Sequence, residues 1–251
     1  MKFITNVSLE SGERNILFSS FAAISGVGLL SYAALPLLMG STMDSLSLNE
    51  RDVGILYSLE FIAAAISSLV IAPKTGKVRR RDLAYAGAII VILGNLASAW
   101  WCTYAYLIMI RPLTGIGAGI ALACGNATIA NAKQPEKIAG MMNVMFAGML
   151  LLLMVLLTFL SEAWGLQGVF LGLVLTTLIF FLMLMLMPQR AIKSDSALSS
   201  AKTDNRVIFS VAGIAVFAEL RAESLLMARW GISINMRIKI RVVNTKPRKT
   251  S

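Results

Sequence analysis

The chain has 251 residues and a formal net charge of +10; 57% of its residues are hydrophobic and only 14% are charged. Soluble domains contain about 45–50% apolar and about 25% charged residues, so this composition excludes an ordinary soluble protein and predicts one embedded in a membrane. Histidine is absent, which removes the usual general base and the commonest metal ligand and disfavours hydrolytic chemistry.

Six apolar segments of 19 to 25 residues follow one another along the chain. A helix of about 20 residues crosses a hydrocarbon core of about 30 Å, so each segment predicts one transmembrane helix. We therefore expect an all-α integral membrane protein, with a cytoplasmic segment at residues 1–15 and a six-helix transmembrane domain at residues 16–188. The predicted spans are Ile16–Met39, Val53–Pro73, Leu83–Trp101, Tyr106–Ala130, Ile138–Leu160 and Leu166–Met187.

Basic residues gather in alternate connections between these segments. The connections after the first, third and fifth spans contain Arg51 as their single basic residue, whereas those after the second, fourth and sixth are basic. Cytoplasmic loops carry an excess of lysine and arginine, so we expect a multi-pass protein of the inner (plasma) membrane with a cytoplasmic N-terminus. This distribution indicates a lipid bilayer, and not nucleic acid, as the partner of the basic residues.

The chain changes character after the sixth span. Residues 189–206 are rich in Ser, Lys and Asp and predict a cytoplasmic linker. Residues 207–220 are an apolar run too short to cross the membrane unaided, which predicts a partial seventh segment. Residues 221–251 contain eight basic residues and one acidic residue without helical periodicity, which predicts a disordered basic tail. The pattern predicts a truncated or frameshifted product; the alternative is a basic cytoplasmic tail behind a re-entrant or interfacial segment.

Three sequence patterns point to one family. The fourth span contains RPLTGIGAG from Arg111 to Gly119, the second begins within LSLNERDVGILYSLEF from Leu46 to Phe61, and the loop VRRRD follows the second span. Over residues 15–190 the chain resembles the N-terminal half of a major facilitator superfamily transporter, whose corresponding patterns include RxxxGxGxG and GxxxDRxGRR. The resemblance implies a six-helix half built as a 3+3 inverted repeat, which moves a small solute by alternating access with proton coupling.

Two departures from the family pattern limit what the resemblance implies. Thr75 stands where the family has an Asp, and Val78 stands where it has a Gly, so the latch that this loop forms between the two halves is in doubt. The fifth span has only Gly148 in its middle, instead of the Gly-Pro pair of proton-coupled drug antiporters. Drug efflux is disfavoured accordingly. The basic residues that the resemblance assigns to a cytoplasmic gating loop are Lys77, Arg79, Arg80 and Arg81.

Two charged residues lie inside predicted spans. Glu60 follows Val53 by seven residues and Arg111 follows Tyr104 by seven, so both lie about 10 Å below the outer surface. A charge in the bilayer costs about 2.5–3.5 kcal/mol on insertion scales, so such residues are candidates for function. Equal depth permits a buried pair, which either fixes helix packing or exchanges partners with a substrate or proton during transport.

Polar and small residues extend the predicted site. Tyr32 and Asn126 lie on the two spans that line the cavity in the family, so the resemblance implies contact with substrate. Gly115, Gly117 and Gly119 allow helix backbones to approach closely, which predicts helix packing first and conformational change second. Amides facing lipid are costly, so helix packing is also expected for most asparagines in or near spans three to five, namely Asn95, Asn126, Asn131 and Asn143.

The sequence indicates no catalytic residue, cofactor or metal. Cys102 and Cys124 form no CxxC motif and are interpreted as small apolar residues. A GxxxxGK[ST] phosphate loop is missing, so an ion gradient would supply the energy. The leading prediction is a secondary transporter of a small-molecule substrate, completed by self-association or by a missing C-terminal half. The alternative is a non-transporting membrane protein, either a transporter remnant or an assembly factor; an intramembrane enzyme is disfavoured.

Overall fold

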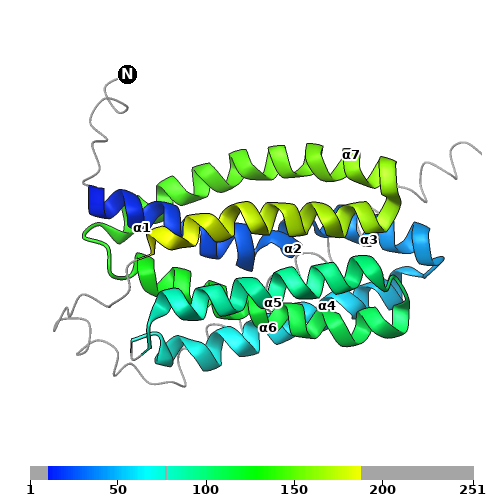
Figure 1. The fold of residues 1–251 in the computed structure, drawn as a ribbon, viewed down its shortest axis with the longest axis horizontal. Coiled ribbons are helices and arrows are strands. Elements are labelled where there is room, and N and C mark those ends of the chain that lie inside the picture. Colours follow the sequence, from blue (N-terminus) through cyan, green and yellow to red (C-terminus); the bar gives the residue numbers. More distant parts are fainter. Residues whose placement is uncertain (1–10, 77, 188–251) are drawn as a thin grey trace, which may run out of the picture. The chain divides into compact units, whose positions relative to one another are not determined.

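The computed structural model describes residues 11–76 and 78–187, and all the regular structure within them is helical (Figure 1). Lys77 and the predicted linker, partial seventh segment and basic tail lie outside the described residues. Figure 1 shows the helices running along one common axis, with their connections gathered at its two ends. This arrangement is the one that a set of membrane-crossing helices requires.

The first apolar segment forms an interrupted helix, where a single helix was predicted over Ile16–Met39. Its parts are α1 (Ser11–Phe21), the π-helix η1 (Ala22–Gly28), α2 (Leu30–Ala33) and α3 (Leu35–Leu46). Gly26 and Gly28 weaken the middle of this segment, because glycine is about 1 kcal/mol less favourable in a helix than alanine. Pro36, in the first turn of α3, cannot donate a backbone hydrogen bond to the preceding turn. The sequence-based prediction therefore missed both interruptions.

The next three predicted spans are found as continuous helices. They are α4 (Glu50–Ile71), extended by the 3₁₀ turn η2 (Ala72–Lys74), then α5 (Arg80–Trp100) and α6 (Tyr104–Ile129). Asn49 fixes the beginning of α4, because its side-chain oxygen accepts a hydrogen bond of 2.8 Å from the backbone N–H of Asp52. α6 contains Pro112 directly after Arg111, so one backbone hydrogen bond is missing beside the charged residue.

The last two predicted spans form the two arms of a single long element, α7 (Pro135–Met183), which ends in η3 (Leu184–Leu186). Gly165 has φ 58° and ψ −142°, a conformation that favours glycine, and the helix direction reverses there (Figure 1). The reversal separates two helical arms and lies within the connection predicted between Leu160 and Leu166. A hydrogen bond of 3.0 Å between the hydroxyls of Ser41 and Ser161 fastens this turn to α3.

Four helices of the described chain are long and apolar enough to cross a membrane by length and composition. They are Glu50–Lys74, Arg80–Trp100, Tyr104–Ile129 and Pro135–Leu186. The predicted number of six is not confirmed by this criterion. The interrupted first segment does not qualify as one helix, and the two arms of α7 count as one.

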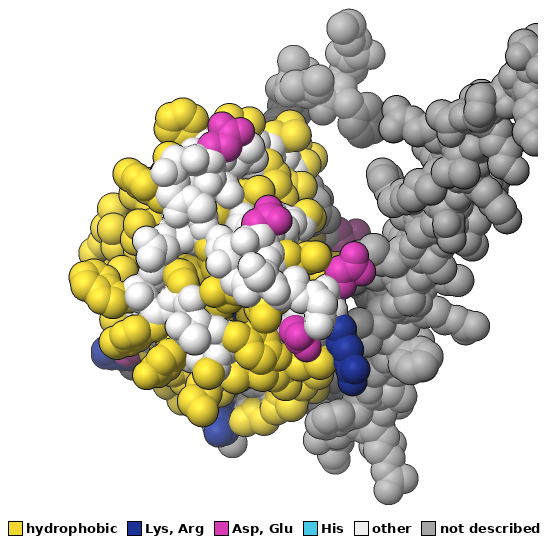
Figure 2. Space-filling model, turned by 90° about the vertical axis from the view of Figure 1, so that its right-hand side faces the viewer, with side chains coloured by type: hydrophobic (Ala, Val, Ile, Leu, Met, Phe, Trp, Pro, Cys, Tyr) yellow, Lys and Arg dark blue, Asp and Glu magenta, His cyan; other side chains and the backbone are white. Residues whose placement is uncertain are grey.

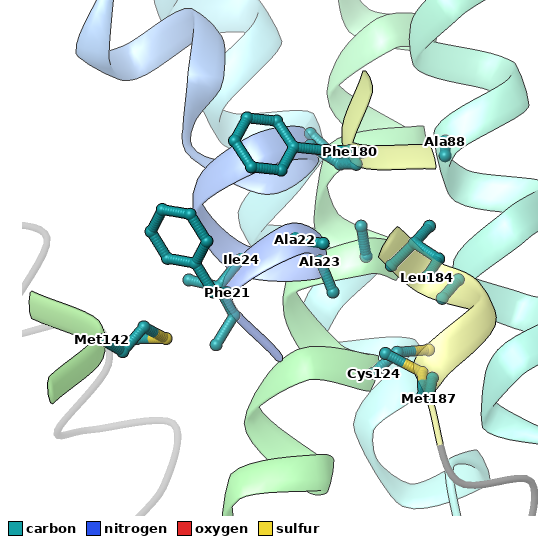
Figure 3. Packing of buried hydrophobic residues seen from close by; sticks show 14 of the residues in the cluster. Phe21, Ala22, Ala23, Ile24, Ala88, Cys124, Met142, Phe180, Leu184 and Met187 are labelled. Carbon is teal, nitrogen blue, oxygen red and sulfur yellow. The ribbon is translucent and has the colours of Figure 1, made fainter. Parts of the chain in front are cut away.

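Two clusters of buried apolar side chains fill the bundle. The first joins α1 and η1 to α6, α7 and η3, and Figure 3 shows Phe21 and Phe180 in this cluster, with ring centroids 5.5 Å apart in an edge-on contact. The second cluster joins α3, α4 and both arms of α7 around Leu38, Leu56 and Leu157. It lies beside the charged residues of α4 and α6, which the following section describes.

Acidic and basic side chains are distributed unequally between the two ends of the bundle. Figure 2 shows the end that holds the α3–α4 connection and the reversal in α7, with acidic side chains on its surface and hydrophobic side chains around the rim. Asp44, Glu50 and Glu162 are exposed in these connections. Exposed Lys74 and Arg79 belong to the connection between α4 and α5, at the opposite end. The alternation of charge along the sequence is thus an alternation between ends in space.

Candidate functional site

The glycine-rich face of α6 brings α4 and α5 into close contact with it. A Cβ atom at Gly115 would collide with the backbone of Glu60, and one at Gly119 would collide with Ala64 and Ser67, both on α4. Gly117 meets Gly87 and Ile90 of α5 in the same way. The absence of a side chain at these glycines therefore allows α4 and α5 to approach the backbone of α6 closely.

Glu60 and Arg111 meet at this contact. Nη1 of Arg111 donates a hydrogen bond of 3.0 Å to Oε2 of Glu60, and the two side chains form an ion pair that is 0% and 2% exposed. The equal depth predicted from sequence places them in reach of each other, and the glycine at position 115 lets the two helices come close enough. A buried pair of this kind neutralises two charges that would each be costly alone.

Two side chains of α5 complete the hydrogen bonding of the guanidinium. Nη2 of Arg111 donates to Oδ1 of Asn95 at 2.8 Å and to the hydroxyl of Ser98 at 3.3 Å. Asn95 and Ser98 lie one helical turn apart, so both point toward α6 from one face of α5. All these side chains are buried, and the site thus joins three helices through one arginine.

Aromatic rings enclose the charged centre. The Cζ atom of Arg111 lies 4.6 Å from the ring centroid of Phe170 in the second arm of α7 and 5.9 Å from that of Tyr57 on α4. A guanidinium over an aromatic face gains further stabilisation when it is shielded from water. The Tyr57 hydroxyl is held by the Thr42 hydroxyl at 2.9 Å, so the ring is fixed against α3.

Three polar atoms of the site have no hydrogen-bond partner. They are Oε1 of Glu60, Nδ2 of Asn95 and Nε of Arg111, all buried. Native proteins pair almost all of their buried polar groups, so each unpaired one calls for an explanation, such as a catalytic role or a bound water or ion. The cluster therefore retains two donors and one acceptor for a group other than the residues that now form it.

The other predicted site residues lie apart from the pair. Tyr32 is 41% exposed and packs edge-on against Phe61, the residue after Glu60, with ring centroids 5.5 Å apart. Asn126 is exposed and lies 15 residues beyond Arg111 on α6, which is about 22 Å along a helix. The structure thus brings Tyr32 next to the α4 segment that carries Glu60, whereas Asn126 lies near the other end of α6.

The basic loop contains three consecutive arginines with different surroundings. Arg79 is exposed and lies 3.9 Å from Asp82. Arg80 is buried, and it donates to the backbone oxygens of Thr75 and Ala127, each at 3.1 Å. Arg81 is partly exposed. Arg80 therefore ties the loop to the last turn of α6, where unpaired carbonyls and the helix dipole favour a cation.

No three side chains from His, Cys, Asp and Glu come together as a metal site in the part of the chain that the structure describes. The buried cluster can bind a charged group and exchange one charged partner for another.

The family model described as Major Facilitator Superfamily matches residues 16–237 of the chain. The chain belongs to the Major Facilitator Superfamily. A search of curated proteins finds no match.

Membership in the superfamily makes the chain a multi-pass membrane protein of a transporter family, as predicted from its sequence patterns. The family match extends beyond residue 190, where the resemblance predicted from sequence ended, to residue 237. It includes the predicted linker and partial seventh segment, which lie outside the described residues.

Sequence reasoning missed several members of this superfamily protein's buried cluster. Asn95 was expected to pack between helices, and its contact with Arg111 was not foreseen, although the spacing of Asn95 and Ser98 places both on one helix face. The spacing also places Tyr57 near Glu60, because Tyr57 precedes Glu60 by three residues and therefore lies on the same face of the helix. Phe170 lies on α7 and carries no local signal that could have identified it.

Proposed function

We propose that the chain acts as a secondary transporter, which moves a small solute across the inner membrane by alternating access and couples this movement to protons. The observation that carries the proposal is the buried Glu60–Arg111 pair with three unpartnered polar atoms around it. A carboxylate with one oxygen unpaired can take up a proton, and the loss of its charge would release Arg111 from the pair. Each protonation state would thus favour a different arrangement of α4 and α6.

We propose that the chain has six transmembrane spans, which together form one half of the superfamily fold. The interrupted segment from Ser11 to Leu46 is one span, and α7 supplies two on either side of Gly165. A cytoplasmic N-terminus is supported by the basic residues at the end that holds Lys74 and Arg79 and by the acidic residues at the other end.

Three further parts have roles in the proposed cycle. Gly115, Gly117 and Gly119 provide a smooth surface on which α4 and α5 move against α6. We place Tyr32 and Asn126 along the path of the solute, at different distances from the pair, since both are exposed on helices of the bundle. The basic loop acts as the cytoplasmic gate. Lys77 was predicted to belong to this loop and lies outside the described residues, whereas Arg80 fastens the loop to α6.

The proposal is tested by transport in proteoliposomes that contain the full chain. An imposed proton gradient should drive the uptake or efflux of at least one solute from a mixed metabolite panel, and Glu60→Gln should abolish the effect of the gradient. Glu162→Gln is the matched control, because it makes the same change at an exposed carboxylate, and it should behave as the unchanged chain. Gradient-driven transport that is unaffected by Glu60→Gln would refute the role of the pair. If neither the single chain nor two copies linked in tandem transport any solute, the chain is better explained as a non-transporting membrane protein.

A further inference from the structure

The connection between α4 and α5 carries two exposed cations on one turn. Lys74 ends the 3₁₀ extension of α4, and Arg79 directly precedes α5; both side chains are exposed. The backbone N–H of Val78 donates to the backbone oxygen of Lys74 at 3.2 Å, which closes a turn between the two cations. Lys74 and Arg79 therefore lie at the two sides of one short turn.

The buried Arg80 fixes the place of this turn. Its guanidinium donates to the backbone oxygen of Thr75, within the turn, and to that of Ala127 in α6, each at 3.1 Å. The charge of Arg80 is thus directed to carbonyls inside the bundle and is not available to a group outside it. A backbone held in this way presents Lys74 and Arg79 at the edge of the bundle.

Exposed apolar side chains lead along α4 to Lys74. Ile62, Ile66 and Val70 are 54%, 58% and 53% exposed, and each is four residues from the next, as Val70 is from Lys74. Side chains four residues apart form a row along the surface of a helix. This row is about 18 Å long, which is more than half of a hydrocarbon core of about 30 Å. In a membrane the row contacts acyl chains, and Lys74 stands at its end.

The exposed face of α5 has the same order, with Arg79 at its end. Asp82, Ala86, Ile89 and Leu93 follow Arg79 at intervals of three or four residues, and all are exposed. Asp82 lies 3.9 Å from Arg79, and a contact between two exposed side chains at this distance is weak. Each side of the turn thus joins a cation to a row of exposed side chains that becomes apolar with distance from the turn.

The combination of charge and apolar surface selects the kind of partner. A soluble polyanion would meet Lys74 and Arg79 but would leave the apolar rows uncovered. A zwitterionic lipid would cover the rows, but its headgroup brings a cation of its own next to the two basic residues. A lipid with a net negative charge satisfies both features, because its phosphate accepts hydrogen bonds from lysine and arginine while its acyl chains lie beside the helices.

We propose that this turn binds an anionic phospholipid of the bilayer, with the phosphate at Lys74 and Arg79 and the acyl chains along the rows on α4 and α5. The site is separate from the buried ion pair and does not depend on the proposed transport. Asp82 repels the headgroup through its own negative charge. Replacement of this carboxylate by a neutral amide therefore strengthens the binding.

The experiment titrates the purified full chain in a non-ionic detergent with dioleoylphosphatidylglycerol and follows the unfolding temperature. Dioleoylphosphatidylcholine has the same acyl chains without a net charge, and glycerol phosphate has the charge without acyl chains. At saturation, the anionic lipid should raise the unfolding temperature by about 2–4 °C more than either of them. A high concentration of sodium chloride should weaken this effect, because salt screens exposed charges.

Single substitutions with a matched control identify the residues. Lys74→Gln and Arg79→Gln should each raise the lipid concentration that gives half of the temperature shift by about fivefold, as expected for one basic residue at a membrane surface. Arg51→Gln removes an exposed charge in the first turn of α4, at the opposite end of that helix, and should have no effect. Asp82→Asn should lower the concentration. All four side chains are exposed, so the unfolding temperatures without lipid should stay close to that of the unchanged chain.

The outcomes separate an anionic lipid from other causes of stabilisation. Equal shifts with the two lipids would mean that acyl chains alone stabilise the chain, and an equal shift with glycerol phosphate would mean a site for a soluble anion; either result overturns the inference. An effect of Arg51→Gln as large as that of Lys74→Gln would also overturn it, because it would show a general effect of net charge. A selective shift that Lys74→Gln and Arg79→Gln weaken and Asp82→Asn strengthens would establish the site, whether or not the chain transports a solute.

Discussion

The described chain buries two arginines in different ways. Arg111 pairs with the carboxylate of Glu60, and its cluster holds three polar atoms without a partner: Oε1 of Glu60, Nδ2 of Asn95 and its own Nε. Arg80, near the end of the bundle, donates to two backbone oxygens in the loop and in the last turn of α6. Arg111 belongs to α6 and Arg80 contacts its last turn, and both were singled out from sequence as functional candidates.

The difference between them separates a structural role from one that can respond to a ligand. Backbone oxygens cannot be protonated near neutral pH or move away independently of the chain, so Arg80 has one stable arrangement. A carboxylate can lose its charge, so the partner of Arg111 can change while the fold remains. Removal of Arg80 should therefore affect the attachment of the loop, whereas removal of Arg111 should affect both stability and coupling.

The largest expected effect is that of Arg111→Leu. Breaking a buried ion pair from one side leaves an uncompensated charge and costs about 3–5 kcal/mol. We expect the free energy of unfolding, measured by circular dichroism in increasing concentrations of SDS, to fall by this amount and proton-driven transport to be lost.

The double variant Glu60→Leu/Arg111→Met tests whether the ion pair serves stability or transport. Replacement of both charges by apolar groups should leave stability within about 1 kcal/mol of the unchanged chain or raise it. Transport should still be absent. Transport that persists in this stable double variant would mean that the pair serves helix packing alone.

Arg80→Gln tests the other side of the comparison. It removes hydrogen bonds from a charged donor to two carbonyls and should lower the free energy of unfolding by about 1–3 kcal/mol. The response of transport to pH should stay unchanged, because Arg80 has no carboxylate partner among the contacts described. Arg79→Gln is the control, and its exposed contact with Asp82 should contribute less than about 1 kcal/mol. A change in pH dependence with Arg80→Gln would show that Arg80 does more than attach the loop to α6.

Gly115→Ala tests whether the approach of α4 to α6 maintains the Glu60–Arg111 pair. The added methyl group meets the backbone of Glu60, which cannot move aside as a flexible side chain would. Overpacking of this kind costs about 1–3 kcal/mol. Gly148→Ala is a matched control, because nothing lies within 4 Å of its added Cβ, and it should be neutral or stabilise the helix by up to about 1 kcal/mol. Equal effects of the two substitutions would exclude a special role for the α4–α6 contact.

The sequence was sufficient to predict the helical membrane class, the positions of α4, α5 and α6, and the two charges at equal depth. These features depend on apolar length and on helix rise, which are local properties. The π-helix in the first segment was missed, because glycine alone does not specify where a helix bends. The reversal at Gly165 falls within the connection predicted between Leu160 and Leu166. The sequence does not show which of the three arginines from Arg79 to Arg81 is buried. Successive helix positions point about 100° apart, and only packing selects the buried one.

The smallest effect concerns Cys102, which lies near Arg111 between α5 and α6 and reports on that end of the site. Burial raises the pKa of its thiol above the ordinary value, and the positive charge of Arg111 opposes this rise only in part. Because the thiolate is the reactive form, the rate of maleimide labelling should increase at a higher pH than for an unfolded thiol. Cys124 is completely buried and should stay unlabelled until the chain unfolds. Arg80→Gln should leave the Cys102 profile unchanged, since Arg80 lies at the other end of α6. A Cys102 profile equal to that of a free thiol would mean that the end of the bundle near Arg111 is open to water, and the buried charge balance on which the comparison rests would then not hold.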